Sequence, residues 1–197
     1  MADELKRRLV HASGSGLVAL YLLANYLELG LTWQRFRILM VVLAVGTLAL
    51  EFLRLRVGLE WWIYEKLTRE YEQDQIAGYG LYMISMAAVV LVFPSEIALP
   101  AMLMLALGDP ISGAVSDDTL KRVKSPTVLV TMFVVCTVIA WPFLAPLATL
   151  APIAAALGAT IADGVTVKIR DFVLDDNLTI PIYAAVAAWV VLEFVPV

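Results

Sequence analysis

The stretch IALPAMLMLALGDPISGAV, residues 97–115, is apolar along nearly its whole length and carries one ionisable side chain, that of Asp109. An α-helix needs about 20 apolar residues to cross the hydrocarbon core of a bilayer. Lipid offers no hydrogen-bond partner to an open sheet edge, and the stretch is too long for a barrel strand. It therefore predicts a transmembrane helix with an acid inside it.

Similar apolar runs fill most of the chain, at about 14–32, 36–53, 76–93, 127–144, 150–168 and 179–195. The 197 residues are 61% hydrophobic and 16% charged, with a mean hydropathy of +0.86, and this is too apolar for an average soluble domain. We expect an all-α polytopic transmembrane helix bundle of about seven spans, forming a single transmembrane domain over residues 1–197. The net charge of −4 indicates no nucleic-acid partner.

The positions of the basic residues predict the orientation of this bundle. If the N-terminus is cytoplasmic, the inner segments hold 12 of the 14 Lys and Arg residues, and only Arg35 and Arg37 lie outside. The positive-inside rule therefore predicts a cytoplasmic N-terminus and an external C-terminus. The longest inner segment, at about 54–75, mixes aromatic and charged residues, as is typical of a cytoplasmic segment lying at the membrane interface.

Two acids lie inside predicted spans that run in the same direction. At 1.5 Å per residue, Asp109 and Asp163 are each roughly 18 Å from the outer end of their span, so both fall in the cytoplasmic third. An ionisable side chain at such a depth costs about 2.5–3.5 kcal/mol and normally has a partner or a function. The Gly108-Asp109-Pro110 sequence, followed by Gly113, should also interrupt its helix there. These features predict a ligand site, with a structural ion pair to Lys or Arg as the alternative.

More polar residues follow each of these two spans. They are Asp117, Asp118, Lys121, Arg122, Lys124 and Ser125 after the first, and Lys168, Arg170, Asp171, Asp175, Asp176 and Asn177 after the second. Carboxylates and an Asn suit a hard cation such as Mg²⁺, and Lys and Arg suit phosphate. A nucleoside triphosphate with its metal needs both kinds of residue. The P-loop and the G-x-G-x-x-G, H-E-x-x-H and G-x-S-x-G motifs are absent.

Five short motifs, taken in order, resemble those of the CTP-dependent polyprenol kinases, the family that includes dolichol kinase and phytol kinase. They are the basic-then-His opening Glu4–His11, the acid-x-x-Arg of Glu51–Arg54, the Gly-Asp signature Leu107–Pro110 with Gly113, the pair Lys124-Ser125, and the Asp-Asn-x-x-x-Pro of Asp176–Pro181. The chain departs from the family pattern at Ser116-Asp117-Asp118, at Asp163, and at Pro126.

The resemblance implies an integral membrane enzyme that transfers the γ-phosphate of CTP to the hydroxyl of a long-chain isoprenoid alcohol. The reaction would use Mg²⁺ or a similar divalent cation at a cytoplasmic active site, in the cell membrane if the source is prokaryotic. Phosphoryl transfer is mostly positioning and charge neutralisation, and the implied roles follow from that.

Asp109, Asp176 and Asn177 are expected to bind the metal, and Asp109, Asp163 and His11 to be catalytic, with Asp163 as the residue that orients or deprotonates the alcohol. Roles within the carboxylate set are exchangeable. The residues expected to contact nucleotide or phosphate are Arg8, Gly108, Gly113, Lys121, Lys124, Ser125 and Lys168.

Two other functions would use some of the same residues. A membrane cytidylyltransferase that forms a CDP-lipid would also bind CTP and Mg²⁺, although its usual His-Gly-Gly and Asp-Arg pattern is absent. A small transporter would explain the intramembrane acids Asp109 and Asp163. Polar residues become rare in the outer half of the predicted bundle, which disfavours a path for a transported solute.

Overall fold

The computed structural model describes residues 4–59, 68, 72–116, 123–165, 168–169 and 172–194, and the described chain is almost entirely helical. Its elements, in order, are α1 (Glu4–Ser13), α2 (Ser15–Tyr26), α3 (Trp33–Phe52), the π-helical turn η1 (Leu53–Val57), α5 (Gly78–Val92), α6 (Ser95–Leu103), the π-helical turn η3 (Met104–Gly108), α7 (Asp109–Ala114), α8 (Pro126–Leu144), α9 (Ala151–Gly164), the two-residue strands β1 (Lys168–Ile169) and β2 (Phe172–Val173), and α10 (Asp176–Phe194).

Each predicted apolar run corresponds to one helix, except 97–115, which corresponds to the consecutive elements α6, η3 and α7. Four helical segments are long and apolar enough to cross a membrane, namely Trp33–Val57, Ser95–Ala114, Pro126–Leu144 and Asp176–Phe194. The helices Gly78–Val92 and Ala151–Gly164 are also apolar but shorter. The helical class is therefore confirmed, and the lengths of four segments are those of membrane spans.

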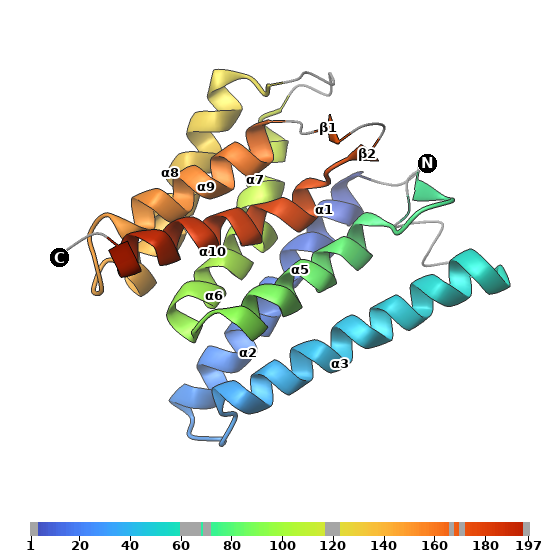
Figure 1. Cartoon of the computed structure of the whole chain (residues 1–197), viewed down its shortest axis with the longest axis horizontal. Helices are drawn as coiled ribbons and strands as arrows, with labels where there is room; N and C mark the ends of the chain where they lie inside the picture. Colours follow the sequence, from blue (N-terminus) through green and yellow to red (C-terminus); the bar gives the residue numbers. More distant parts are fainter. Residues whose placement is uncertain are drawn as a thin grey trace.

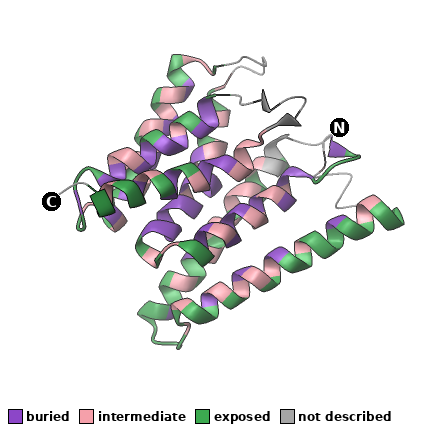
Figure 2. Ribbon diagram, in the orientation of Figure 1, coloured by how far each residue is buried: buried purple, intermediate pink, exposed green. Residues whose placement is uncertain are grey.

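The helices lie side by side, and the start of α1 and the end of α10 are at opposite ends of the bundle (Figure 1). The segment from α6 through η3 to α7 is central, since 61% of an apolar 18-residue window within it is buried inside the protein. The segment Trp33–Val57, which contains α3, is peripheral, with 11% of its apolar window buried, and its exposed face is visible in Figure 2. In a membrane such an apolar exposed face would contact lipid.

Two helix ends differ from the boundaries predicted for the first and sixth runs. The first helical path starts at Glu4 and turns at Gly14, where an added Cβ would overlap the hydroxyl of Tyr82. The sixth helix ends at Gly164, because Val165 forms an antiparallel bridge with Val123 and the chain then enters the β1–β2 hairpin. Backbone pairing thus competes with helix continuation at the end of α9.

The interruption predicted at Gly108-Asp109-Pro110 takes the form of a π-helical turn, and the helical path runs on from η3 into α7. Pro110 has no N–H to donate to the preceding turn, so regular α-helical bonding cannot pass through it. A π turn inserts one residue at this point, and such turns are frequent at functional sites. Asp109 is the first residue after that turn.

Six residues, 145–150, join α8 to α9. The α9 and α10 helices then pack closely, because a Cβ at Gly158 would lie 2.5 Å from the carbonyl oxygen of Tyr183. Small residues permit this kind of close approach between helices in membranes. The contact holds together the two helices that carry Asp163 and Asp176.

Half of the predicted interfacial segment, including Trp61, Trp62 and Tyr64, lies outside the described residues. Glu51 and Arg54, on the N-terminal side of these residues, form a buried ion pair that bonds to residues 72–79 on the other side. Arg54 donates to both carboxylate oxygens of Glu51, at 2.9 and 2.8 Å, and to three backbone carbonyls in the segment 72–75. The backbone N–H of Ala77 and the hydroxyl of Tyr79 also donate to Glu51.

Candidate functional site

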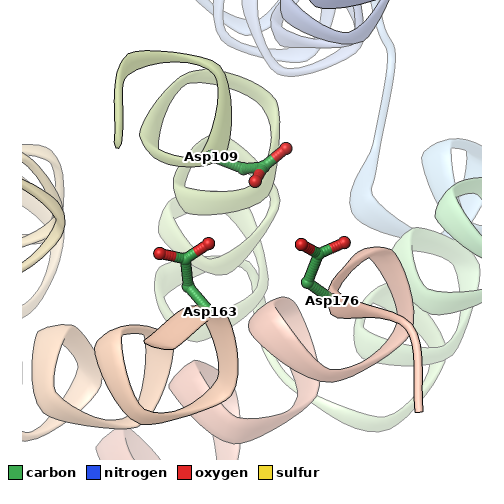
Figure 3. A group of neighbouring side chains, drawn as sticks. All are labelled: Asp109, Asp163 and Asp176. Carbon is green, nitrogen blue, oxygen red and sulfur yellow. The ribbon is translucent and has the colours of Figure 1, made fainter. Parts of the chain in front are cut away.

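Three carboxylates from three helices meet at one end of the bundle. Asp109 begins α7, Asp163 lies in the last turn of α9, and Asp176 begins α10. One oxygen from each can be chosen so that all three lie within 4.8 Å of one another. Figure 3 shows these carboxylates around a common space. Residues far apart in the sequence therefore form one acidic cluster, which we call the acid site.

Asp163 is the most buried member of the acid site and is paired with Lys124. The Lys124 ammonium lies 2.6 Å from Asp163 Oδ1 and 4.0 Å from Asp176 Oδ2, and the Ser112 hydroxyl donates to Asp163 Oδ2 at 3.3 Å. The backbone N–H of Lys124 donates to the carbonyl of Gly164, which fixes this residue beside the end of α9. Burial lowers the pKa of Lys124, but the charges of Asp163 and Asp176 raise it above its ordinary value overall. Lys124 is therefore cationic at neutral pH.

His11 contacts the opposite side of the acid site. Its Nδ1 lies 3.0 Å from Asp109 Oδ2, and its ring packs edge-on against Tyr82 with 4.5 Å between the ring centroids. The Tyr82 hydroxyl donates to the carbonyl of His11 at 3.0 Å. The second ring nitrogen, Nε2, is buried and has no hydrogen-bond partner among the described residues. With Nδ1 bonded to a carboxylate, Nε2 is left as the atom that can accept a hydrogen bond.

Two of the residues predicted to contact phosphate have structural contacts near Asp109. Arg8 Nη2 donates to the carbonyl of Gly113 at 3.0 Å, across the end of α7. A Cβ at Gly108 would lie 3.0 Å from Cys136 Sγ and 3.2 Å from Met132 Sδ, so this glycine permits close packing of η3 on α8. Arg8 and Gly108 thus contact the helical segment that carries Asp109.

The remaining predicted residues are placed less centrally. The amide nitrogen of Asn177 donates to Asp175 Oδ1 at 2.6 Å, and the backbone N–H of Asn177 donates to the same oxygen. Ser125 is the N-cap residue of α8, directly after Lys124. Lys168 lies in β1, where the structure describes only the backbone, and Lys121 lies outside the described residues. The roles of these residues stay predictions.

The donor set of the acid site fits a hard divalent cation. Mg²⁺ binds oxygen at 2.0–2.1 Å in an octahedron, so two oxygens on opposite sides of it are about 4.2 Å apart. Of three oxygens on one ion, at least two pairs are adjacent and about 3 Å apart, so oxygens that lie within 4.8 Å of one another would reach a shared cation by moving inward. Among the described residues, the Lys124 ammonium lies within 4.0 Å of two of these carboxylates, on Asp163 and Asp176, and a divalent cation would add positive charge beside all three.

The structure adds residues that the sequence did not single out. Tyr82, Ser85 and Ser112 are buried polar side chains in apolar helices, and each hydrogen bonds near the acid site. Their isolation among apolar neighbours was a usable signal, because a buried hydroxyl needs a partner. Their partners include backbone carbonyls, which any residue carries, so the sequence alone could not pair them.

The fold and the acid site together define a helical protein with membrane-length segments and an acidic cluster at one end, in which Asp163 is buried and Asp109 and Asp176 are partly exposed. No family model, no curated protein and no solved structure matches this chain.

Proposed function

We propose that this protein is a membrane kinase that transfers the γ-phosphate of CTP to the hydroxyl of a long-chain isoprenoid alcohol. The observation that carries the proposal is the meeting of Asp109, Asp163 and Asp176 with His11 and Lys124. All of these residues except Asp163 come from the motifs that resemble the polyprenol kinases, and those motifs are far apart in the sequence. A site for a metal-bound triphosphate needs acids and a cation together.

In the proposed site, Asp109 and Asp176 hold the divalent cation, which neutralises phosphate charge when it is bound. Lys124 offers its ammonium to a phosphate oxygen, and Asp163 fixes the position of that ammonium at 2.6 Å. Asp163 Oδ1 already accepts from the Lys124 ammonium, and Asp163 Oδ2 lies 3.3 Å from the Ser112 hydroxyl. This favours His11 over Asp163 as the acceptor of the alcohol proton, through the unpartnered Nε2.

The reaction replaces one phosphorus–oxygen bond with another. The alcohol oxygen bonds to the γ-phosphorus while the bond from that phosphorus to the β,γ-bridging oxygen breaks, and CDP leaves. The hydroxyl proton passes to His11 Nε2, whose ring is oriented by Asp109 at Nδ1. General-base help of this kind typically contributes 10²–10⁴-fold, and the rest comes from positioning.

We also propose that the acid site faces the cytoplasm, as the distribution of Lys and Arg predicts. Cysteines placed singly at Gln73, near the acid-site end, and at Leu29, in the α2–α3 connection, should react with an impermeant maleimide from opposite sides of the membrane. Both side chains are exposed, and the native Cys136 is fully buried and should stay unlabelled. If Gln73→Cys were labelled from outside intact cells, the proposed orientation would be wrong and the acid-site end would face outward.

The direct test is an assay of the purified protein with γ-labelled CTP, a prenyl alcohol and Mg²⁺. We expect labelled prenyl monophosphate and release of CDP, with activity abolished by EDTA and restored by added Mg²⁺. Turnover with ATP but not with CTP would refute CTP as the phosphoryl donor. Turnover in the presence of EDTA would refute the requirement for a divalent cation. Transfer of CMP to a lipid phosphate would identify a cytidylyltransferase instead, and no product with either acceptor would favour a non-enzymatic role.

A further inference from the structure

Three hydroxyl side chains lie along α5 at intervals of three residues, and each bonds to a different helix. Tyr79 donates to Glu51 of α3, Tyr82 to the carbonyl of His11 in α1, and Ser85 to the carbonyl of Asn177 in α10. Side chains three residues apart lie on the same side of a helix. We call Tyr79, Tyr82 and Ser85 the hydroxyl row. It extends about 9 Å along the helix axis.

Tyr82 is tied to the part of α1 that carries His11. Its side chain is 7% exposed, its hydroxyl lies 3.0 Å from the His11 carbonyl oxygen, and its ring supports the His11 imidazole. The hydroxyl sits against Gly14, where any Cβ would overlap it. The turn between α1 and α2 is thus shaped to admit this tyrosine.

Ser85 is tied to the first turn of α10, next to Asp176. It is fully buried, and its hydroxyl donates to the Asn177 carbonyl at 2.6 Å. Asn177 immediately follows Asp176, so this bond fixes the backbone beside an acid-site carboxylate. A buried hydroxyl bonded to another helix sets the axial position of that helix more sharply than apolar packing does.

We propose that Tyr82 and Ser85 are positioning residues for the acid site. The α5 helix contributes no carboxylate to the cluster of Asp109, Asp163 and Asp176. Its hydroxyl row instead sets α1, which carries His11 to Asp109, and α10, which carries Asp176. The inference rests on the proposed function, because it takes the acid site to be a site for a divalent cation.

The test measures Mn²⁺ binding to the full-length protein in detergent by electron paramagnetic resonance, together with kinase turnover. Tyr82→Phe and Ser85→Ala each remove one oxygen atom and keep the rest of the side chain. Loss of a hydrogen bond worth about 1 kcal/mol corresponds to about fivefold. We expect Ser85→Ala to weaken Mn²⁺ binding by about that factor and to regain turnover at high Mn²⁺ concentration.

Tyr82→Phe acts on His11, so it should lower kcat by about fivefold even at saturating Mn²⁺. Gly14→Ala should give a larger loss by displacing the Tyr82 hydroxyl, and adding Tyr82→Phe should partly reverse that loss. The matched controls are Tyr183→Phe, whose side chain is 39% exposed on α10, and Ser13→Ala, whose hydroxyl bonds only within α1. Both controls should leave Mn²⁺ affinity and kcat unchanged.

The outcomes separate this inference from the function on which it rests. If the unaltered protein binds no Mn²⁺, the metal site and the inference both fail. If it binds Mn²⁺ but Tyr82→Phe and Ser85→Ala match their controls, positioning by the hydroxyl row is wrong and the metal site stands. A lower melting temperature with unchanged Mn²⁺ affinity and kcat in the folded fraction would make these residues purely structural and would also overturn the inference.

Discussion

Asp109→Asn is expected to lower kcat/KM for the prenyl alcohol by at least about two orders of magnitude, equivalent to roughly 2.7 kcal/mol of lost transition-state stabilisation. The substitution keeps the size of the side chain and an oxygen that can accept from His11 Nδ1, at present 3.0 Å away. It removes the charge that a metal-bound triphosphate requires. The measurement is initial rate against alcohol concentration at saturating CTP and Mg²⁺.

The same variant should remain folded, because neutralising a largely buried acid relieves its desolvation. Asp74→Asn is the matched control, since that side chain is exposed in the segment before α5, and its kinetics should be normal. A folded Asp109→Asn protein with near-normal turnover would remove Asp109 from the catalytic site. Loss of folding in Asp109→Asn would instead mean that the carboxylate has a structural role.

Glu51→Ala is expected to lower the free energy of unfolding by about 3–5 kcal/mol, the cost of removing one partner of a buried ion pair. The carboxylate is 1% exposed and accepts from Arg54, from the backbone N–H of Ala77 and from Tyr79. Its removal leaves the Arg54 guanidinium without a counterion in a buried place. Unfolding by denaturing detergent, followed by circular dichroism, measures the change.

The free energy of unfolding of Glu51→Gln should lie between those of the unaltered protein and Glu51→Ala. The amide oxygen can still accept from Ala77, but the charge opposite Arg54 is lost. Glu193→Ala is the matched control: this exposed residue near the end of α10 should change stability by less than about 0.5 kcal/mol. If Glu51→Ala lowered the free energy of unfolding by less than about 1 kcal/mol, the Glu51–Arg54 pair would contribute no more than a surface salt bridge does.

The sequence predicted the helices and part of the acid site for one physical reason. Apolar runs, and charged residues inside them, are both visible in the hydropathy pattern. Asp109 and Asp163 are conspicuous because a charge in an apolar run is costly, and their similar depth followed from the rise per residue. Asp176 was singled out from the acids before the last run only because the Asp176–Pro181 motif resembles that of the polyprenol kinases. The structure brings the three together within 4.8 Å.

The features that the sequence did not predict leave at most a weak signal in the hydropathy. Tyr82 and Ser85 hydrogen bond to backbone carbonyls, which no residue type identifies, and a lone Tyr or Ser in a membrane helix is common. The π turn before Asp109 depends on how the chain accommodates Pro110, and a proline is equally compatible with a break or a kink. The pairing of Val123 with Val165 depends on tertiary contact between segments 42 residues apart.

The acid-site residues are far apart along the chain, and this separation determines when the site can form during synthesis. Asp109 is synthesised 67 residues before Asp176, which at about 5–20 residues per second is a delay of about 3–13 s. Lys124 follows Asp109 by only 15 residues, but throughout that time the α6–η3–α7 segment has no α10 beside it. The site can therefore assemble only when the last helix enters the membrane, and a chain truncated before Asp176 would insert most of its helices without ever forming it.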